Sequence, residues 1–408
     1  ETARGAKRSP VHAQLAAAGA RFRDVSGWEG ADWYGTVEDD PLTWGRPAWF
    51  GQWAAEHRAV REGVGLMDMS FMAKFLVQGR DAGAVLDHLS AGDVDGEAGR
   101  VTYTQWLNTS GRLEADLTVT KLDAERYWVV ASDTAHRHVE TLIRRALGFG
   151  ALASANATVT DVTSGWAQLN LQGPRSRDLL TSLTSADVSD AAFPFRAART
   201  IDLGYAQVLC LRITYLGELG YELYVPAEHA VEVYQRVVAA GAAFGLRHAG
   251  LKALSSLRME KAYRDYGHDI DNTDTVVEAG LGFAVALTRA DGAARDFIGR
   301  AAVEAQRAAG PPSSRLVQVL VGDPQPLLYH GEVLRRDGVE VGYLRAASYG
   351  HTLGGAVGLA MVSTPSGEPV TKAWLDGGTW DVDIVDRRYP VTVSLRPLYD
   401  PTSARVKA

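Results

Sequence analysis

Cysteine is almost absent from the sequence, which has one, Cys210, in 408 residues. A single thiol excludes an internal disulfide, a zinc site of four cysteines and a self-contained iron–sulfur cluster, and it fits a reducing compartment. Positive charge is also in deficit, since 42 Lys and Arg stand against 49 Asp and Glu, for a net charge of −7. This balance argues against a general nucleic-acid or anionic-membrane binder, although one local basic site is compatible with it.

Long apolar segments and the common catalytic motifs are missing as well. No apolar run reaches the roughly 18 residues of a membrane span and no charged-then-apolar leader occurs, so we expect a cytoplasmic protein without membrane contact. The patterns G-x-G-x-x-G, G-x-x-x-x-G-K-[ST], G-x-S-x-G and H-E-x-x-H do not occur either. The sequence therefore lacks the motifs that usually indicate a dinucleotide-binding protein, a P-loop protein, a serine hydrolase or a zincin. The ten histidines are scattered, and we expect no metal site.

An internal repeat organises the first part of the chain. Residues 77–94 (VQGRDAGAVLDHLSAGDV) align without a gap to residues 171–188 (LQGPRSRDLLTSLTSADV). Each copy has an apolar run, a Gln-Gly pair and leucines at helical spacing, which predicts a strand, a turn and a helix. A second pair of amphipathic helices is predicted at Ala135–Gly150 and Ala230–Gly245, and both end in Phe-Gly.

Between these helices the sequence predicts a hairpin in each copy. The run Gly111–Val119 (GRLEADLTV) matches Gly217–Val225 (GELGYELYV), and this alignment pairs Asp116 with Glu222. Strand, helix, hairpin and helix are the components of a ferredoxin-like α+β unit. If two such units pack about an approximate twofold axis, the two carboxylates face one cavity as an acid/base or cation-stabilising pair. The alternative is that each is a surface acid at a strand end.

The two ends of the chain differ from the repeat. After a linker at Gly310–Ser314, short alternating runs separated by Gly, Pro and Asp turns predict a C-terminal β-barrel or jelly-roll-like domain over residues 310–408. Residues 1–44 are rich in Trp, Gly and Asp and are predicted to form a lead segment that packs against the rest. Residues 45–309 contain the duplicated part, whose second unit is predicted to begin at about residue 165.

Several long runs in this order resemble the aminomethyltransferase (glycine cleavage T-protein) family, and the resemblance covers nearly the whole chain. The runs are TYLGELGYE (Thr214–Glu222), LRMEKAYRDYGHDID (Leu257–Asp271), EAGLGFAV (Glu278–Val285) and FIGR (Phe297–Arg300). Others are most similar to the folate-binding C-terminal half of dimethylglycine and sarcosine oxidases and dehydrogenases. These are WFGQWAAEHRAVREGVGLMDMS (Trp49–Ser70), KFLVQG (Lys74–Gly79) and RPLYDP (Arg396–Pro401).

The resemblance implies a three-domain cloverleaf around a central folate channel, with two α+β units and a β-barrel. It implies capture of an iminium or formaldehyde-level carbon from an N-methylated glycine, dimethylglycine or sarcosine, as 5,10-methylenetetrahydrofolate. The flavin fingerprint of the oxidases is absent from this chain. Oxidation is therefore expected from a flavoprotein domain or subunit, and tetrahydrofolate, not FAD, is the expected ligand.

The same resemblance assigns site residues by position. Asp116 matches the family's catalytic Asp, and a buried carboxylate there would stabilise cationic nitrogen. Glu222 matches the pterin-binding Glu, and a carboxylate can accept two N–H bonds from a pterin edge. Arg258 matches the Arg of the L-R-x-E run and is expected to pair with Glu222 or the folate tail, or else structurally with Glu260 or Asp265. The remaining expected contacts with folate or the channel wall are Tyr103, Tyr215, Thr118, Tyr263 and Tyr266.

Two other functions remain open at this level. A stand-alone tetrahydrofolate-dependent demethylase would take a methyl group directly and yield 5-methyltetrahydrofolate. A non-catalytic folate-binding module would bind folate without turnover.

Overall fold

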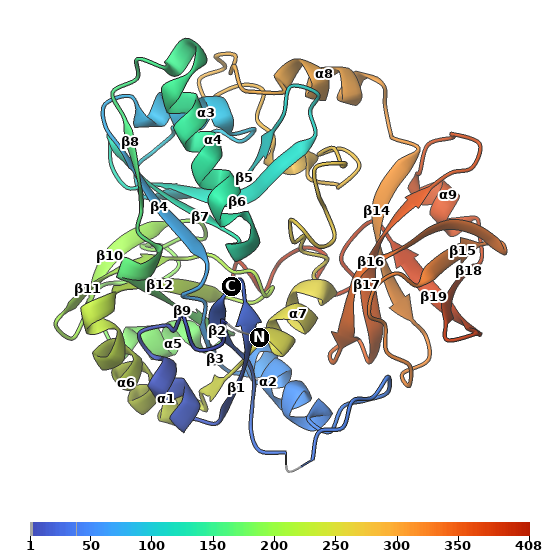
Figure 1. The fold of residues 1–408 in the computed structure, drawn as a ribbon, viewed down its shortest axis with the longest axis horizontal. Coiled ribbons are helices and arrows are strands. Elements are labelled where there is room, and N and C mark those ends of the chain that lie inside the picture. The colour runs from blue at the N-terminus through green and yellow to red at the C-terminus, as the bar shows by residue number, and fades with distance from the viewer. Residues whose placement is uncertain (1–2, 38) are drawn as a thin grey trace.

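The computed structural model describes residues 3–37 and 39–408, which form three lobes around a common centre (Figure 1). Two lobes are built on β-sheets covered by helices, and the third is a closed barrel. The end of the chain returns to the second lobe, where the Ala408 carbonyl accepts hydrogen bonds from Arg177 (2.7 Å) and Arg212 (2.8 Å). Within the described ranges, no helix is long and apolar enough to cross a membrane.

The first lobe is a five-stranded sheet in the order β5-β6-β7-β4-β8. Its elements are β4 (Ala73–Gln78), α3 (Ala82–Leu89), β5 (Arg100–Leu107), β6 (Leu113–Lys121), β7 (Arg126–Ala131), α4 (His136–Gly148) and β8 (Thr158–Asp161). Alternate strand residues face the helices, so that Phe75 of β4 packs in one buried cluster with Val85 of α3 and Ile143 of α4.

The second lobe has a six-stranded sheet in the order β10-β11-β12-β9-β3-β13. Its elements are β3 (Gly65–Asp68), β9 (Trp166–Gln172), α5 (Ser176–Thr181), β10 (Ala198–Leu203), β11 (Ala206–Leu211), β12 (Gly220–Pro226), α6 (Ala230–Gly241) and β13 (Arg247–His248). The faces of the two sheets that lack helices share a cluster that includes Trp128, Leu211 and Tyr224. The sheets are also joined at their edges, since the Val101 amide donates to Arg196 O at 2.8 Å.

Each half of the repeat gives one strand to the other lobe. β3 precedes β4 in sequence but pairs with β9, and β8 precedes β9 but pairs with β4. The Gln-Gly turns stabilise this exchange, because Gly79 (φ +131°) and Gly173 (φ +127°) adopt backbone conformations that other residues rarely reach. A Cβ on Gly79 would lie 2.3 Å from Asn156 O, and one on Gly173 would lie 2.4 Å from Gly63 O. Both carbonyls come shortly before the exchanged strand.

The predicted equivalence of Asp116 and Glu222 is wrong. Three strands separate the helices in each lobe, where the sequence suggested a hairpin. β7 and β12 occupy the same place, since β7 pairs with β4 and leads to α4, while β12 pairs with β9 and leads to α6. Glu222 lies on β12, but Asp116 lies on β6, whose counterpart is β11. A short sequence likeness cannot distinguish adjacent strands of a meander, because strand position depends on pairing partners distant in sequence.

The third lobe is the barrel predicted at the C-terminus, closed in the order β14-β17-β16-β15-β18-β19. Its strands are β14 (Ser314–Val321), β15 (Val333–Arg336), β16 (Val339–Gly350), β17 (Gly355–Ser363), β18 (Trp380–Ile384) and β19 (Arg387–Ser394). Helix α8 (Arg300–Ala308) precedes the barrel, and α9 (Lys372–Asp376) lies between β17 and β18.

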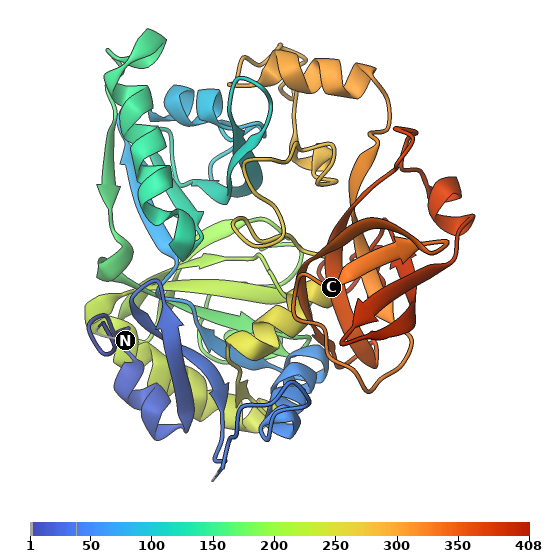
Figure 2. The ribbon, with the colours of Figure 1, turned by 45° about the vertical axis from the view of Figure 1, so that its right-hand side comes forward.

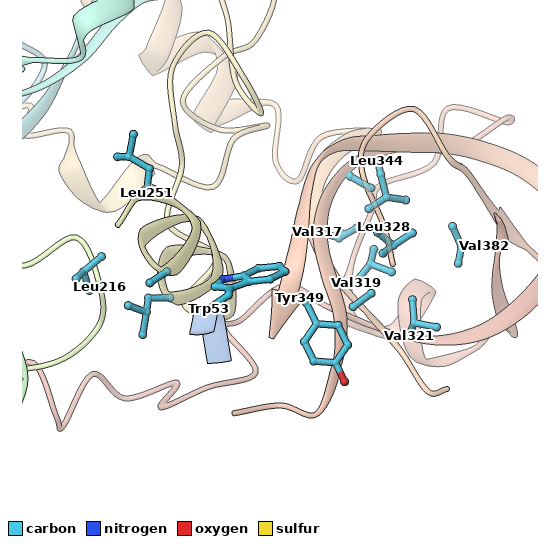
Figure 3. Close-up of a cluster of buried hydrophobic side chains, with 14 of the residues drawn as sticks. Trp53, Leu216, Leu251, Val317, Val319, Val321, Leu328, Leu344, Tyr349 and Val382 are labelled. Atoms are coloured by element: carbon cyan, nitrogen blue, oxygen red, sulfur yellow. The ribbon is translucent and has the colours of Figure 1, made fainter. Parts of the chain in front are cut away.

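Helices α2 (Phe50–Glu62) and α7 (Leu251–Glu260) join the barrel to the second lobe, as the turned view shows (Figure 2). One buried cluster runs from these helices into the barrel. Figure 3 shows Trp53 of α2 directed toward the barrel, with Tyr349 beside it and Val317 and Leu344 inside the barrel. The barrel therefore shares a buried apolar cluster with the helices that adjoin the lobe carrying Glu222.

The lead segment packs on the second lobe. It contains α1 (His12–Ala17) and the antiparallel hairpin of β1 (Ala20–Val25) and β2 (Trp28–Tyr34). Leu15 and Tyr34 join the cluster under the helix-covered face of the second sheet. The Tyr34 amide also donates to Glu56 Oε1 of α2 at 2.6 Å, which ties the hairpin to the centre of the molecule.

Candidate active site between the lobes

Strand β6 carries Asp116 on the face of the first sheet that is turned away from the helices. Leu113, Ala115 and Leu117 are buried, while Asp116 and Thr118 alternate with them and are half-buried. The antiparallel register places Gln105 opposite Asp116 and Tyr103 opposite Thr118. Strands β5 and β6 therefore present Tyr103, Gln105, Asp116 and Thr118 on one surface, and the predicted shared face of Asp116 and Thr118 is confirmed.

The surroundings of the Asp116 carboxyl group raise its pKa toward neutral pH. Desolvation raises the pKa of Asp116 to about 7, with a further increase from the charges of Asp265 and Asp269. Gln105 opposes the shift by donating its Nε2 to Asp116 Oδ1 at 2.8 Å. The hydroxyl of Tyr103 also lowers this pKa. Asp116 is therefore populated both as an acid and as a base at physiological pH.

The segment after α7 supplies the acidic neighbours of Asp116. Arg258 of α7 donates Nη1 to Asp269 Oδ1 at 3.1 Å and to Tyr263 O at 3.0 Å. Arg258 was expected to pair with Glu222 or the folate tail, or structurally with Glu260 or Asp265. Its ion pair within the protein is with Asp269, and a contact with the folate tail stays a prediction. Glu260 instead binds Arg61 (2.9 Å) and the ring of His57 (3.3 Å).

Two tyrosines from different lobes join this group. The Tyr215 hydroxyl donates to Arg264 O at 2.6 Å, and its ring stacks on Tyr263 with centroids 6.1 Å apart. Burial raises the pKa of Tyr215 well above its usual value, and the charges of Asp265, Asp269 and Asp116 add to the shift. Tyr103 stacks on the exposed ring of Phe283 at 6.2 Å. The predicted site residues Asp116, Tyr103, Tyr215, Arg258 and Tyr263 are thus brought together.

Glu222 belongs to a second polar centre, between the two sheets. It lies opposite Asn170 of β9, and the Tyr224 hydroxyl donates to its Oε2 at 2.6 Å. Desolvation raises the pKa of Glu222 to about 7, while the ammonium of Lys74 on β4 lowers it. Lys74 is itself fully buried and donates Nζ to Ser70 O (2.9 Å) and Met72 O (2.7 Å). Burial lowers the pKa of Lys74 to about 7.

Tyr266 lies in the segment after α7, like Tyr263. Its ring packs with the apolar clusters of the first lobe and of the region between that lobe and the barrel. Burial raises the pKa of Tyr266 to about 12, and the charges of Glu114 and Asp271 add to the shift. The structure therefore shows Tyr266 in apolar packing, and its contact with folate or the channel wall stays a prediction.

Buried acceptors without a partner mark both centres as fit for a nitrogen-rich ligand. Among the described residues, Gln105 Oε1 and Asp269 Oδ2 near Asp116 have no hydrogen-bond partner. Gln168 Oε1 and Gln172 Oε1, on the strand that pairs with the Glu222 strand, also have none. Such atoms cost free energy unless a ligand donates to them. A pterin, whose edge presents several N–H groups, suits the acceptors beside Glu222.

Sequence reasoning missed several of these residues. Gln105 could have been found, because it lies two positions from Tyr103 and alternate residues of a strand share one face. Asp269 lies within the quoted run Leu257–Asp271, but nothing in its spacing marks it as the partner of Arg258. Lys74 stands in an apolar strand-like run, where only the packed structure places it next to Glu222.

Comparison with known proteins decides the family. Residues 11–289 match the GCVT N-terminal domain, and residues 315–400 match the glycine cleavage T-protein C-terminal barrel domain. The chain belongs to the glycine cleavage T-protein family. This is a folate-dependent family of the aminomethyltransferase type, so the resemblance found in the sequence is confirmed.

Relatives in this family fall into two groups by length. The chain is 38% identical, over its whole length and 48% of the relative, to 4-methylaminobutanoate oxidase (formaldehyde-forming) of Paenarthrobacter nicotinovorans. It is 30% identical, over 99% of its length and 47% of the relative, to mitochondrial sarcosine dehydrogenase of Homo sapiens. An aminomethyltransferase of Geobacillus kaustophilus is 32% identical, over 87% of this chain and 90% of that one. The chain spans about half the length of the longer T-protein relatives.

The T-protein fold is also confirmed by a solved structure. The glycine cleavage system aminomethyltransferase T from Bartonella henselae superposes with a TM-score of 0.78, covering 97% of this chain and 98% of that chain. At 24% identity this likeness concerns the fold alone. The predicted mixed α+β architecture with a C-terminal barrel is thereby confirmed.

Proposed function

We propose that this chain is a tetrahydrofolate-dependent one-carbon transferase that receives the carbon of an N-methylated glycine, dimethylglycine or sarcosine, and yields 5,10-methylenetetrahydrofolate. Oxidation of the N-methyl group is assigned to a flavin-containing part outside residues 1–408. The observation that carries the proposal is the Asp116 carboxylate, which is half-buried, bonded by Gln105 at 2.8 Å and has a pKa of about 7.

The chemistry of the transfer matches this carboxylate. An iminium is a cation, and an ionised carboxylate in a site of low dielectric stabilises it as it approaches the acceptor nitrogen. When that nitrogen attacks the iminium carbon it becomes cationic, and Asp116 can take up its N–H proton because both protonation states are populated near pH 7. Return of a proton to the original amine lets the demethylated amine leave, so that the carbon stays on folate. Tetrahydrofolate supplies the nucleophilic nitrogen, and the protein supplies charge, position and proton transfer.

The two polar centres divide the binding of folate. Glu222 accepts N–H bonds from the pterin edge, assisted by the free oxygens of Gln168 and Gln172. Tyr215 and Tyr103 offer ring faces and hydroxyls beside Asp116. Arg258 acts indirectly, because its bond to Asp269 fixes the segment that raises the pKa of Asp116.

The relatives support the assignment of oxidation to another part. Proteins named sarcosine dehydrogenase and dimethylglycine dehydrogenase match this chain over only 47% and 43% of their own lengths. Their names denote oxidation, and the matched portion contains the T-protein domains, so the unmatched portion is the natural place for the flavin. A partner flavoprotein would serve the same role if the two parts are separate chains.

A second candidate is a non-catalytic folate-binding module. It is favoured by one relative, the mitochondrial pyruvate dehydrogenase phosphatase regulatory subunit of Mus musculus, which is 30% identical over 98% of this chain and 46% of that protein. Its name describes regulation. This candidate requires folate binding that survives loss of Asp116.

The decisive experiment mixes the purified chain with tetrahydrofolate and either formaldehyde or sarcosine with a sarcosine-oxidising flavoenzyme. Formation of 5,10-methylenetetrahydrofolate is followed for wild type, Asp116→Asn and Glu114→Gln, a matched control on the same strand face that pairs with His138 at 3.0 Å. We expect wild type and Glu114→Gln to accelerate transfer and Asp116→Asn to bind folate without acceleration. Equal rates with and without all three proteins would favour the non-catalytic module, and 5-methyltetrahydrofolate as product would favour the demethylase.

A further inference from the structure

Arg264 brings a positive charge without an acidic partner into the group around Asp116. It lies in the segment after α7 and is half-buried. Its Nε donates to Ala279 O at 2.9 Å, and its Nη1 donates to Ala262 O at 2.6 Å. Within residues 3–37 and 39–408, no hydrogen bond involves its Nη2, and no carboxylate forms an ion pair with it. One edge of the guanidinium is therefore free to donate to a ligand.

The Arg264 guanidinium is held in one place. Its Nη2 packs against Gly280, where an added Cβ would lie 2.8 Å away. In the described part of the chain the ammonium of Lys261 lies over the Tyr263 ring at 5.9 Å, but no such ring contact involves Arg264. Two backbone carbonyls and the close approach to a glycine thus fix the guanidinium before any ligand arrives, which lowers the entropic cost of binding.

Arg264 and Asp116 belong to the same group but do not neutralise each other. Burial lowers the pKa of Arg264, and the acidic groups of Tyr103, Asp269 and Asp116 raise it, so the guanidinium lies within electrostatic range of all three. The Tyr215 hydroxyl also donates to Arg264 O at 2.6 Å. Arg264, Tyr103 and Asp116 are half-buried rather than sealed, and the structure, which describes all three, shows no ion pair between Arg264 and Asp116. Two opposite charges therefore face the site separately.

A second arginine adds positive charge from the barrel side. Arg315 of β14 is half-buried, and its charge lowers the pKa of Arg264. Desolvation lowers the pKa of Arg315 itself, and no carboxylate among the described residues opposes this shift. Two arginines that lie near each other without acidic partners favour the binding of an anion there.

We propose that Arg264 and Asp116 together bind the reacting amine as a zwitterion, with the cationic nitrogen at Asp116 and the carboxylate at the free edge of Arg264. The proposal rests on the proposed function for the reaction at Asp116, and it adds that Arg264 selects amino acids over simple methylamines. A methylamine would leave the desolvated guanidinium without a partner, whereas the carboxylate of a glycine derivative is one carbon from the reacting nitrogen.

The test compares two ligands that differ in the carboxylate. Sarcosine and dimethylamine are both secondary amines, and only sarcosine carries an anion. Each is titrated into the purified chain at pH 8, where Asp116 with its pKa of about 7 is mostly ionised, and binding is followed by calorimetry and ligand-observed NMR. The variants are Arg264→Gln, Arg264→Lys and Asp116→Asn. Arg307→Gln is the matched control, because Arg307 donates to Gly282 O of the same loop at 2.7 Å but is exposed on α8.

We expect wild type and Arg307→Gln to bind sarcosine more tightly than dimethylamine. Arg264→Gln should weaken sarcosine about tenfold and leave dimethylamine unchanged, since only the charge-assisted bonds to the carboxylate are lost. Arg264→Lys should keep part of the preference, because it retains the charge without the planar fork. Asp116→Asn should weaken both ligands, since both carry the cationic nitrogen.

Three results would overturn the proposal. The first is absence of saturable sarcosine binding to wild type. The second is equal weakening of both ligands in Arg264→Gln and Arg264→Lys, which would show a merely structural role. The third concerns the glutamate end of folate, the other source of a carboxylate. If Arg264→Gln weakens tetrahydrofolate but not 6-methyltetrahydropterin, which lacks that end, and the preference for sarcosine is unchanged, Arg264 serves folate instead.

Failure of this proposal is distinguishable from failure of the proposed function, because ligand preference is measured without turnover. If Asp116→Asn retains transfer activity while Arg264→Gln loses the preference for sarcosine, the catalytic assignment fails and the role of Arg264 stands. If Arg264→Gln keeps the preference while Asp116→Asn loses transfer, the role of Arg264 fails and the function stands.

Discussion

Gln105 and Asp116 face each other across β5 and β6, and the Gln105 amide donates to the Asp116 carboxylate at 2.8 Å. This bond favours the ionised form of a carboxyl group that burial otherwise keeps protonated. The pair therefore sets the pH at which Asp116 becomes ionised and available as the proposed base.

Replacing Gln105 with Leu should move the pH dependence of transfer. Loss of the hydrogen bond raises the pKa of Asp116 above about 7, by on the order of one unit for one hydrogen bond to a charged acceptor. The rise of activity with pH should shift upward accordingly, with reduced rate at pH 7 and recovery at higher pH. The pH–rate profile checks this, with the same substitution at the exposed strand residue Gln207 as the control. An unshifted profile would show that the bond does not tune the reacting group.

Replacing Asp116 with Asn should stabilise the protein at high pH. The pKa of Asp116 is about 7 in the folded protein and near its ordinary value of 3.8 when unfolded, so the folded state holds the proton more tightly. Ionisation therefore costs folded stability as pH rises from about 4 to about 7. The variant avoids this cost, and its free energy of unfolding should exceed that of wild type by on the order of 2 kcal/mol at pH 8. Denaturant titrations at pH 8 and pH 4 measure the gain, which should vanish at the lower pH.

Replacing Lys74 with Met should make folate binding depend on pH. The Lys74 charge lowers the pKa of Glu222, so its removal raises that pKa further above about 7. A protonated Glu222 is a weaker acceptor of N–H bonds than the carboxylate. The affinity of the variant for tetrahydrofolate should therefore fall at pH 7 and recover toward pH 9. Glu222→Gln should lose affinity at every pH. Calorimetry at pH 7 and pH 9 measures the affinity of both variants. If Lys74→Met loses the same affinity at both pH values, as Glu222→Gln should, the charge of Lys74 does not control the ionisation of Glu222.

Replacing Gly79 or Gly173 with Ala should destabilise the protein strongly. Both glycines have φ near +130°, and the added Cβ would meet a backbone carbonyl within 2.4 Å. We expect each change to cost about 2 kcal/mol or more, since strain and overlap add together. Gly96→Ala is the matched control, because nothing lies within 4 Å of its Cβ position. Thermal and denaturant unfolding measure the difference, and a cost no greater than that of the control would show that the two turns are adaptable.

The sequence by itself determined the local elements and the family. The Gln-Gly turns, the amphipathic helices that follow them and the alternating C-terminal runs each depend on residues close together in the chain, and all appear as α3, α5, α4, α6 and the barrel. Asp116 and Thr118 share a face because strand geometry alone requires it. The long runs around Thr214–Glu222 and Leu257–Asp271 were enough to indicate the glycine cleavage T-protein family.

Only the tertiary structure decided how distant segments meet. Strands β3 and β8 are exchanged between the lobes through pairing with strands distant in sequence, and the same long-range pairing places Glu222 on a strand that is not equivalent to that of Asp116. The pairing of Arg258 with Asp269 likewise follows no rule of sequence spacing. The pKa values of Asp116, Glu222 and Lys74 likewise arise from burial, which no local pattern specifies. Local propensity fixes the elements, whereas pairing and desolvation are properties of the packed whole.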